Sequence, residues 1–202
     1  MKLPASRRNM LLVAVVLAVI AGLAGWQYLG QPDPTKGRSL LPTIGGPFTL
    51  VDQTGKTVNN KDLRGRFLLI YFGYTFCPDV CPTALTAMAG ALDLLGAKAD
   101  EITPVFITVD PERDTSEQLA MYAKYFHPRL VALTGSPEQI AKVAKDYRVY
   151  YAKAVEEGTD ADDYLMDHTS ITYLTDRDGT FRLHFSHDTD AETMAKRIRE
   201  HL

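Results

Sequence analysis

Two apolar runs separated by a helical pattern constrain the fold of this chain most strongly. Phe67 to Gly73 (FLLIYFG) and Thr103 to Asp110 (TPVFITVD) are predominantly apolar runs, which is typical of strands buried on both faces of a sheet. A helical spacing of apolar residues lies between them, at Leu85, Met88, Leu92 and Leu95. A strand, a helix and a second strand in this order predict a βαβ unit with two parallel strands.

The remaining elements complete an α/β pattern. The segments FTLVD and GKTVN, from Phe48 to Asn59, predict a short hairpin. Ile171 to Phe185 predicts a second one, with Asp178-Gly179 in its turn. Three further helices are indicated by pairs typical of a capping box, namely Asp114 with Glu117, Ser136 with Gln139, and Thr189 with Glu192. Strands that alternate with helices and end on an antiparallel hairpin predict a three-layer α/β domain.

The N-terminal region predicts a membrane anchor. The apolar stretch from Met10 to Leu29 is long enough to cross a bilayer as one helix. Basic residues precede it and aromatic residues stand near its end, namely Lys2, Arg7, Arg8, Trp26 and Tyr28. The positive-inside rule then places the N-terminus in the cytoplasm and the rest of the chain across the membrane.

A cleaved signal peptide is the competing interpretation, with cleavage near Gly22 to Ala24 (GLA). We favour the anchor because the apolar run continues past that site. The predicted domains are a cytoplasmic N-terminus at 1–9, an anchor at 10–29, a linker at 30–40 and a folded domain at 41–202. Either interpretation exports the folded domain to an oxidising compartment, where a disulfide can form.

Cys77 and Cys81 are the only cysteines, and they stand in a loop (CPDVCP) after the first buried strand. If the next helix begins at Pro82, Cys81 becomes its N-cap, where backbone N–H groups favour a thiolate. Three uses are open: a structural disulfide, thiol exchange, or binding of a soft metal such as Cu(I). The structural disulfide is the weakest of these, since closing so short a loop stabilises little.

The net charge of −3 gives no sign of a nucleic-acid partner. Among the five histidines, His168 stands immediately before the predicted strand Ile171 to Leu174. A histidine there is by itself more often a loop residue than a ligand. We interpret the others as surface or structural residues, namely His127, His184, His187 and His201.

Three separated motifs carry a resemblance to a known family. YFGYTFCPDVCPTAL, VDPERDTSEQL and YLMDHTSITYLTDRDG together resemble the SCO/SenC family of membrane-anchored copper proteins. The resemblance implies a thioredoxin-like fold with a central mixed sheet. It also implies a copper site formed by Cys77, Cys81 and His168, with Cys77 and Cys81 able to form a redox disulfide. Thioredoxin-like thiol-exchange enzymes have a cis-proline where Ser170 stands here. The absence of that proline favours metal binding over thiol exchange.

The resemblance further implies a metallochaperone that delivers copper to the binuclear copper-A (CuA) site of cytochrome c oxidase subunit II during assembly. Its partners would be that subunit and a periplasmic copper donor or thiol reductant. We assign no catalytic residue and expect no turnover reaction. Cu(I) would bind both thiolates and one imidazole, while Cu(II) would need a further donor, from water or Asp79. The alternatives are a thiol–disulfide oxidoreductase acting on the cysteines of the same target, and a peroxidase.

Four smaller expectations complete the prediction. The short basic N-terminus favours a bacterial inner membrane with a periplasmic domain, the alternative being the mitochondrial inner membrane. The segment Asp110 to Asp114 is interpreted as a turn and a helix cap without chemistry. Glu156 to Asp167 is interpreted as a mobile solvated loop, or as a docking surface that moves His168. Tyr71 and Tyr74 are interpreted as plain strand residues.

Overall fold

The computed structural model of the protein describes residues 17–23, 26, 43–155 and 163–202. The chain divides into two compact units, Met1–Pro42 and Thr43–Leu202. In the first unit, residues 17–23 are helical and exposed. The rest of the predicted anchor at 10–29, apart from Trp26, and the whole predicted linker at 30–40 lie outside the described residues. The anchor therefore stays a prediction.

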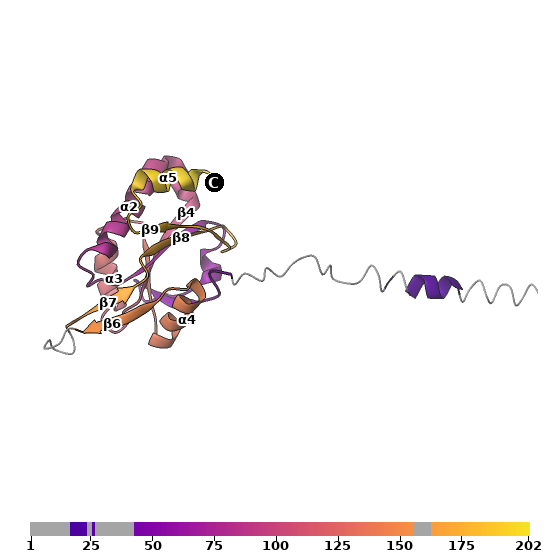
Figure 1. Cartoon of the computed structure of the whole chain (residues 1–202), viewed down its shortest axis with the longest axis horizontal. Coiled ribbons are helices and arrows are strands. Elements are labelled where there is room, and N and C mark those ends of the chain that lie inside the picture. Colours follow the sequence, from indigo (N-terminus) through magenta and orange to yellow (C-terminus); the bar gives the residue numbers. More distant parts are fainter. Residues whose placement is uncertain (1–16, 24–25, 27–42, 156–162) are drawn as a thin grey trace, which may run out of the picture. The chain divides into compact units, whose positions relative to one another are not determined.

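The second unit is organised around a mixed seven-stranded sheet (Figure 1). Its strands follow the order β2 (Thr57–Asn59), β1 (Thr49–Asp52), β5 (Val131–Thr134), β4 (Ile102–Thr108), β3 (Phe67–Gly73), β8 (Ile171–Thr175) and β9 (Phe181–Ser186). β3, β4 and β5 are parallel, whereas β8 pairs with β3 antiparallel. The predicted βαβ unit and both predicted hairpins are confirmed.

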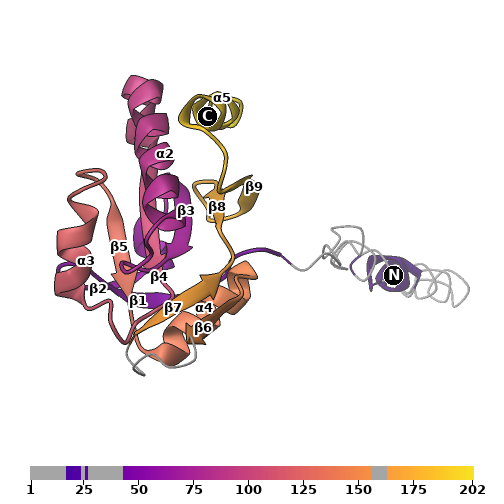
Figure 2. The same ribbon diagram turned by 60° about the vertical axis from the view of Figure 1, so that its left-hand side comes forward.

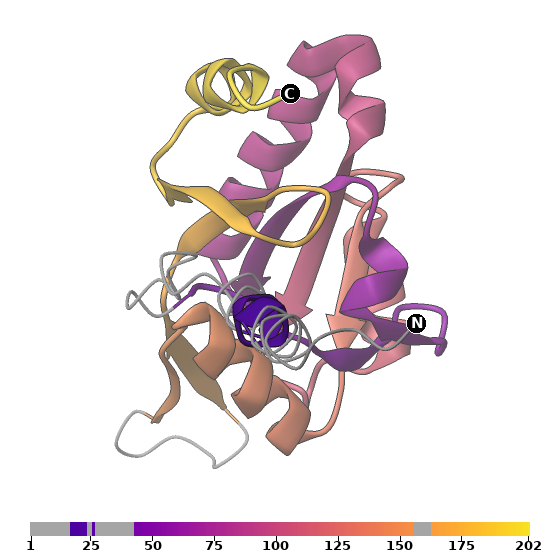
Figure 3. The same ribbon diagram turned by 90° about the vertical axis from the view of Figure 1, so that its right-hand side faces the viewer.

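Helices cover both faces of this sheet. They are α2 (Val80–Leu95), α3 (Ser116–Ala123), α4 (Pro137–Tyr147) and α5 (Ala191–Arg199), with short 3-10 helices at η1 (Asn60–Leu63) and η2 (Gly96–Glu101). Figures 2 and 3 show α2 and α5 side by side, with α4 on the other side of the sheet. The three predicted layers are confirmed.

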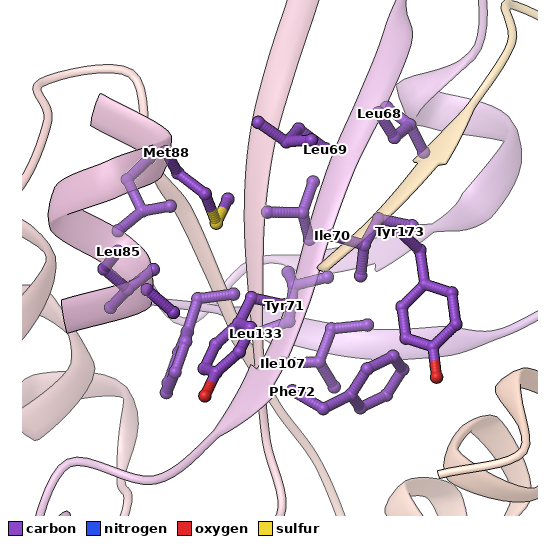
Figure 4. Close-up of a cluster of buried hydrophobic side chains, with 14 of the residues drawn as sticks. Leu68, Leu69, Ile70, Tyr71, Phe72, Leu85, Met88, Ile107, Leu133 and Tyr173 are labelled. Carbon is purple, nitrogen blue, oxygen red and sulfur yellow. The ribbon is translucent and has the colours of Figure 1, made fainter. Parts of the chain in front are cut away.

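The central strand β3 explains why both faces need covering. All seven of its residues are buried, and successive side chains of a strand point to opposite faces. Tyr71 points toward Leu85 and the other apolar residues of α2, while Phe72 points toward Tyr173 (Figure 4). The ring of Phe72 also packs against Tyr147 of α4, with the ring centroids 5.3 Å apart. The continuous apolar run in the sequence is therefore the mark of a two-sided strand.

One helical stretch among the described residues is long and apolar enough to cross a membrane, Val80–Glu101. It comprises α2 and η2, and its residues Leu85, Met88 and Leu92 are buried inside the folded unit. Its length and composition are explained by its place in the core.

The starts of α3 and α5 differ from the prediction. α3 begins after Thr115, whose hydroxyl accepts the N–H of Gln118, rather than after Asp114. α5 begins after Asp190, one residue beyond the predicted Thr189. In both places, an adjacent residue of the same capping type supplies the cap. The capping box of α4 at Ser136 and Gln139 is confirmed.

Candidate metal centre

The loop after β3 brings both cysteines to the carboxyl edge of the sheet, where open α/β sheets collect ligands. α2 begins at Val80 with Asp79 as its N-cap residue, so Cys81 lies inside the first turn. The predicted start at Pro82, with Cys81 as the cap, is wrong. The side chain of Asp79 makes no capping hydrogen bond, and the sulfur of Cys77 accepts the backbone N–H of Cys81 at 3.4 Å. Cys77 therefore holds the thiolate-favouring place predicted for Cys81.

His168 arrives on an element that the sequence did not reveal. It is the last residue of β7 (Tyr164–His168), which pairs antiparallel with β6 (Tyr151–Val155) in a separate two-stranded sheet. Tyr164 and Met166 are buried, while Leu165 and Asp167 are exposed. The predicted loop at Glu156 to Asp167 is thus wrong for 164–167, and 156–162 lie outside the described residues.

The three predicted ligands converge. One sulfur from Cys77, one from Cys81 and a ring nitrogen from His168 all lie within 4.8 Å of one another. Nε2 of His168 lies 3.4 Å from Sγ of Cys81. Nδ1 lies 3.3 Å from the carbonyl oxygen of Thr169, to which its N–H can donate a hydrogen bond. That tautomer leaves the Nε2 lone pair facing the sulfurs, as a metal-binding imidazole requires. We call these three residues the thiol–imidazole site.

The two thiols prefer opposite protonation states. The Cys81 thiol donates a hydrogen bond to Cys77, and the main-chain N–H groups of Asp79 and Cys81 add to it. These donors hold the pKa of Cys77 well below its usual range. The same interaction, together with burial, raises the pKa of Cys81. In the metal-free protein, Cys77 is therefore the thiolate and Cys81 the buried thiol.

Tyr71 and Tyr74 contact residues of the thiol–imidazole site, so the prediction that they are plain strand residues is wrong. The hydroxyl of Tyr71 donates to Sγ of Cys81 at 3.9 Å, and burial raises the pKa of Tyr71, so the hydroxyl stays a donor. The His168 ring makes T-shaped contacts with the rings of Tyr71 and Tyr74, with centroids 6.1 and 5.9 Å away. Both residues come shortly before Cys77 in the sequence, and this position is the signal that could have placed them beside the site.

Gly73 is required by the close packing beneath the cysteines. A Cβ at this position would lie 2.8 Å from Sγ of Cys81, 2.9 Å from a ring carbon of Tyr71 and 3.0 Å from one of Phe106. Glycine at the end of β3 therefore lets the helix bring Cys81 down onto the sheet.

The structure does not bring the other candidate into the site. Asp79 is exposed, and its carboxylate is not among the atoms that converge with the sulfurs. Within the described residues, the thiol–imidazole site is the one cluster of three or more such side chains with converging ligand atoms. The predictions for His184, His187 and His201 hold, since all three are exposed.

A second polar group lies beside the cysteine loop, and we call it the Asp114 cluster. The buried carboxylate of Asp114 accepts the N–H of Thr75 at 3.0 Å and the Thr75 hydroxyl at 2.6 Å. It also accepts the hydroxyl of Thr108 at 2.6 Å. These bonds attach the cysteine loop to the segment after β4, which is a structural role.

The fold and this geometry define a thioredoxin-like protein with two thiols and an imidazole placed together at the edge of its sheet. Soft sulfur donors with one imidazole are a donor set suited to Cu(I). Residues 37–202 match the family model SCO1/SenC, and the chain belongs to that family.

Relatives and a solved structure agree with this assignment. The chain is 47% identical over 149 residues to a SCO2-like protein of Rickettsia prowazekii, covering 74% of this chain and 72% of the relative. It is 44% identical over 176 residues to a mitochondrial SCO1 homologue of Arabidopsis thaliana, covering 85% of this chain and 51% of the relative. The chain thus spans about half the length of that plant protein.

Among solved structures, ScoI of Bradyrhizobium japonicum with copper bound is 47% identical, with a TM-score of 0.72. The match covers 79% of this chain and 99% of the other. The thioredoxin-like fold with a mixed central sheet, predicted from the sequence, is confirmed.

Proposed function

We propose that this protein binds copper through Cys77, Cys81 and His168 and delivers it to cytochrome c oxidase. The observation that carries the proposal is the convergence of two sulfurs and one imidazole nitrogen within 4.8 Å, on elements separated by almost ninety residues. Copper bound to a 47% identical relative supports the choice of metal. Zinc is less suited, because a closed zinc site normally takes four protein ligands.

The donor set suits a carrier. Two thiolates and a neutral imidazole satisfy Cu(I), which accepts low coordination numbers and soft ligands. Cys77 and His168 are only partly buried, so the site is accessible to a partner. Copper is then the cargo of the protein. Because a disulfide has no thiolates to offer, oxidation of Cys77 and Cys81 would prevent loading, and the redox state would control delivery.

The recipient is proposed from the family. The Sco family is a family of cytochrome c oxidase assembly proteins. We propose CuA of subunit II as the target, with a copper donor or thiol reductant as a second partner. We further propose that residues 10–29 anchor the chain in a bacterial inner membrane, after a cytoplasmic segment at 1–9. A linker at 30–40 would then join the anchor to a periplasmic domain at 41–202.

Replacing His168 with Ala tests the metal site. We expect Cu(I) affinity to fall by about 10- to 100-fold, since one of three ligands is lost while the dithiol remains. Thiol–disulfide exchange with a small disulfide should survive. The affinity is measured by anaerobic competition with a chelator of known strength, on the full-length reduced protein in detergent. His184→Ala, which removes an exposed histidine, is the matched control. Unchanged copper affinity in His168→Ala would contradict the assignment.

The second candidate is a thiol–disulfide oxidoreductase acting on the cysteines of the same target. One observation favours it, namely a thiolate at Cys77 beside the thiol of Cys81. This function predicts that the reduced protein opens a disulfide in a CuA-domain substrate without copper. His168→Ala should leave that rate within about threefold, because the imidazole is not the nucleophile. A reduced protein that leaves the substrate disulfide intact rules the second candidate out.

A further inference from the structure

The hairpin β6–β7, which carries His168, is not part of the central sheet. It forms its own two-stranded sheet, with Tyr151 paired to His168 and Val155 paired to Tyr164 (Figure 1). Strand pairing in the large sheet begins with β8 at Ile171, three residues after His168, and β8 pairs with β3, so it places the end of β7 but not its start at Tyr164. The direction in which β7 leaves the sheet is set by contacts of the hairpin with the rest of the domain.

A closed set of three residues holds the far end of β7 to the body of the domain, and we call it the Arg113 cluster. Nε of Arg113 donates to Oδ2 of Asp110 at 2.5 Å, and Nη1 donates to the carbonyl oxygen of Tyr164 at 2.9 Å. The Tyr164 hydroxyl donates to Oδ1 of Asp110 at 2.9 Å. The Arg113 guanidinium also lies 3.6 Å from the centre of the Tyr164 ring. Each member thus contacts both others.

The cluster is shielded from water, which makes these contacts strong. The side chain of Asp110 is 1% exposed and that of Arg113 is 18% exposed. The planar guanidinium of an arginine can pair with a carboxylate and stack on an aromatic ring at the same time. The ammonium group of a lysine cannot reproduce both contacts. Lys153 of β6 adds an outer link, since it pairs with Glu112 at 2.7 Å and lies 4.4 Å from the centre of the Tyr164 ring.

The geometry of the strand connects this cluster to the site. Tyr164 and His168 are four residues apart on β7, so they lie on the same face and about 13 Å from each other. Asp110 and Arg113 follow β4 directly, and Asp114 ties the same segment to Thr75 in the cysteine loop. The Arg113 cluster therefore joins the strand that carries the imidazole to the segment that holds the thiols.

We propose that Asp110, Arg113 and Tyr164 are positioning residues that hold His168 within bonding distance of the two sulfurs. The inference rests on the proposed copper site. The cluster touches neither the sulfurs nor the imidazole. It acts by keeping β7 against the body of the domain, so that copper meets three ligands rather than two. Weakening the cluster should release the imidazole while leaving the dithiol in place.

Arg113→Lys and Tyr164→Phe test this proposal. Arg113→Lys keeps the positive charge but loses the planar guanidinium, which bonds Asp110 and Tyr164 at the same time. Tyr164→Phe loses only the hydrogen bond from the hydroxyl to Asp110. Each is made in the full-length chain, alone and together with His168→Ala, and Cu(I) affinity is measured by anaerobic chelator competition. The matched control is Arg177→Lys, because Arg177 also pairs with a carboxylate, Glu101, and lies over a ring, Phe67. Phe67 stands at the opposite end of β3 from the cysteine loop.

We expect Arg113→Lys to weaken Cu(I) binding by about tenfold and Tyr164→Phe by about threefold, as for residues that support a metal ligand. In the His168→Ala background, neither should weaken it further by more than about twofold, because the ligand they position is gone. X-ray absorption of copper-loaded Arg113→Lys should show a reduced nitrogen contribution with both sulfurs retained. Arg177→Lys should match the parent protein in affinity and in its X-ray absorption spectrum.

Two results would overturn the proposal. One is an equal loss of affinity with and without His168, which would make the cluster a general stabiliser. The other is parental affinity and a parental nitrogen contribution in both single variants, if circular dichroism shows that they are folded. These results are distinct from failure of the copper site itself, which appears as unchanged affinity in His168→Ala alone.

Discussion

The thiol–imidazole site and the Asp114 cluster lie at the same carboxyl edge of the sheet, yet they are built in opposite ways. In the Asp114 cluster, a buried carboxylate meets three donors from Thr75 and Thr108 at 2.6 to 3.0 Å. In the thiol–imidazole site, a thiolate, a thiol and an imidazole converge at longer distances, and the Cys81 sulfur lies 3.4 Å from the imidazole nitrogen. The carboxylate of Asp114 already has its hydrogen-bond partners within the protein, whereas the thiol–imidazole site has three potential metal-ligand atoms that converge on one point.

The contrast between the two clusters separates structural residues from functional ones within the family motifs. Both clusters belong to sequence stretches that carry the family resemblance. Asp114 has its acceptors filled by protein donors, so its removal should affect folding. The sulfurs and the imidazole are soft ligands facing one another, so their removal should affect copper. Polar groups that are buried and fully bonded stabilise a fold, while converging ligands invite an ion.

The largest loss of copper binding is expected at Cys81. Cys81→Ser should lower Cu(I) affinity by at least about 100-fold, because an alcohol is a poor ligand for this soft ion. Stability should change far less, since serine is close to cysteine in size. Anaerobic chelator competition measures the first and urea unfolding the second. Copper binding within a few-fold of the parent would mean that Cys81 is not a ligand.

Asp114→Asn should do the reverse. The amide cannot accept all three donors, and we expect unfolding to become easier by about 2 kcal/mol because a buried donor is left unpaired. Copper affinity of the folded protein should stay within about threefold. Asp52→Asn is the matched control, since Asp52 accepts three similar bonds from Thr54 and Lys56 near the surface. Urea unfolding should show a clearly smaller loss for that variant, and equal losses would count against the role of burial.

The two thiols should react differently with an alkylating reagent. A lowered pKa keeps Cys77 a thiolate as the pH falls below about 8.5, the ordinary thiol value, whereas Cys81 has a raised pKa and stays a thiol. At about pH 6, iodoacetamide should modify Cys77 at least tenfold faster than Cys81 in the reduced, metal-free protein. Peptide mass spectrometry identifies the site. Equal rates, or a rate midpoint near 8.5 for Cys77, would refute the assignment of the thiolate.

Gly73→Ala should disturb the thiol–imidazole site through packing alone. The added methyl would meet Sγ of Cys81 at 2.8 Å, so the sulfur or the strand must shift. We expect a loss of about 1 to 3 kcal/mol in stability, as for an overpacked core, together with weaker copper binding. Gly90→Ala is the control, since the added Cβ would approach only one neighbouring atom, Cβ of Ala191, at 3.0 Å. Gly55→Ala is unsuitable as a control because Gly55 has a positive φ. Parental stability and affinity in Gly73→Ala would show that the site tolerates displacement of Cys81.

The smallest effect is expected at Asp79. Asp79→Asn should change Cu(I) affinity by less than about threefold, because the carboxylate is exposed and lies outside the converging atoms. Competition titration in parallel with Cys81→Ser places both on one scale. A loss comparable to that of His168→Ala would restore Asp79 as a ligand.

Much of the fold was predictable because the strongest patterns coincide with burial. The run at Phe67 to Gly73 is a strand with every residue buried, and the helical spacing from Leu85 to Leu95 marks the inner face of α2. The hairpin β6–β7 was not predicted because its strands carry charges, at Lys153 and Asp167, and because the apolar Leu165 occupies an exposed position of β7. Tyr164 and Met166 do alternate with exposed residues, but the acidic residues before them suggested a solvated loop.

The site was predictable as a set of residues, and less so as a geometry. Cys77, Cys81 and His168 followed from the family motifs. Which sulfur is the thiolate depended on a helix start that the proline pattern misplaced by two residues. The contacts of Tyr71 with His168 and of Arg113 with Tyr164 join segments that are distant in the chain, and a single sequence carries no signal for such pairs.

X-ray absorption on the full-length protein, loaded anaerobically with one equivalent of Cu(I), tests the copper site directly. We expect two sulfur neighbours and one nitrogen neighbour, with the nitrogen lost in His168→Ala and retained in His184→Ala. A spectrum with two sulfurs alone, or a nitrogen signal that survives His168→Ala, would contradict the claim that His168 completes the copper site.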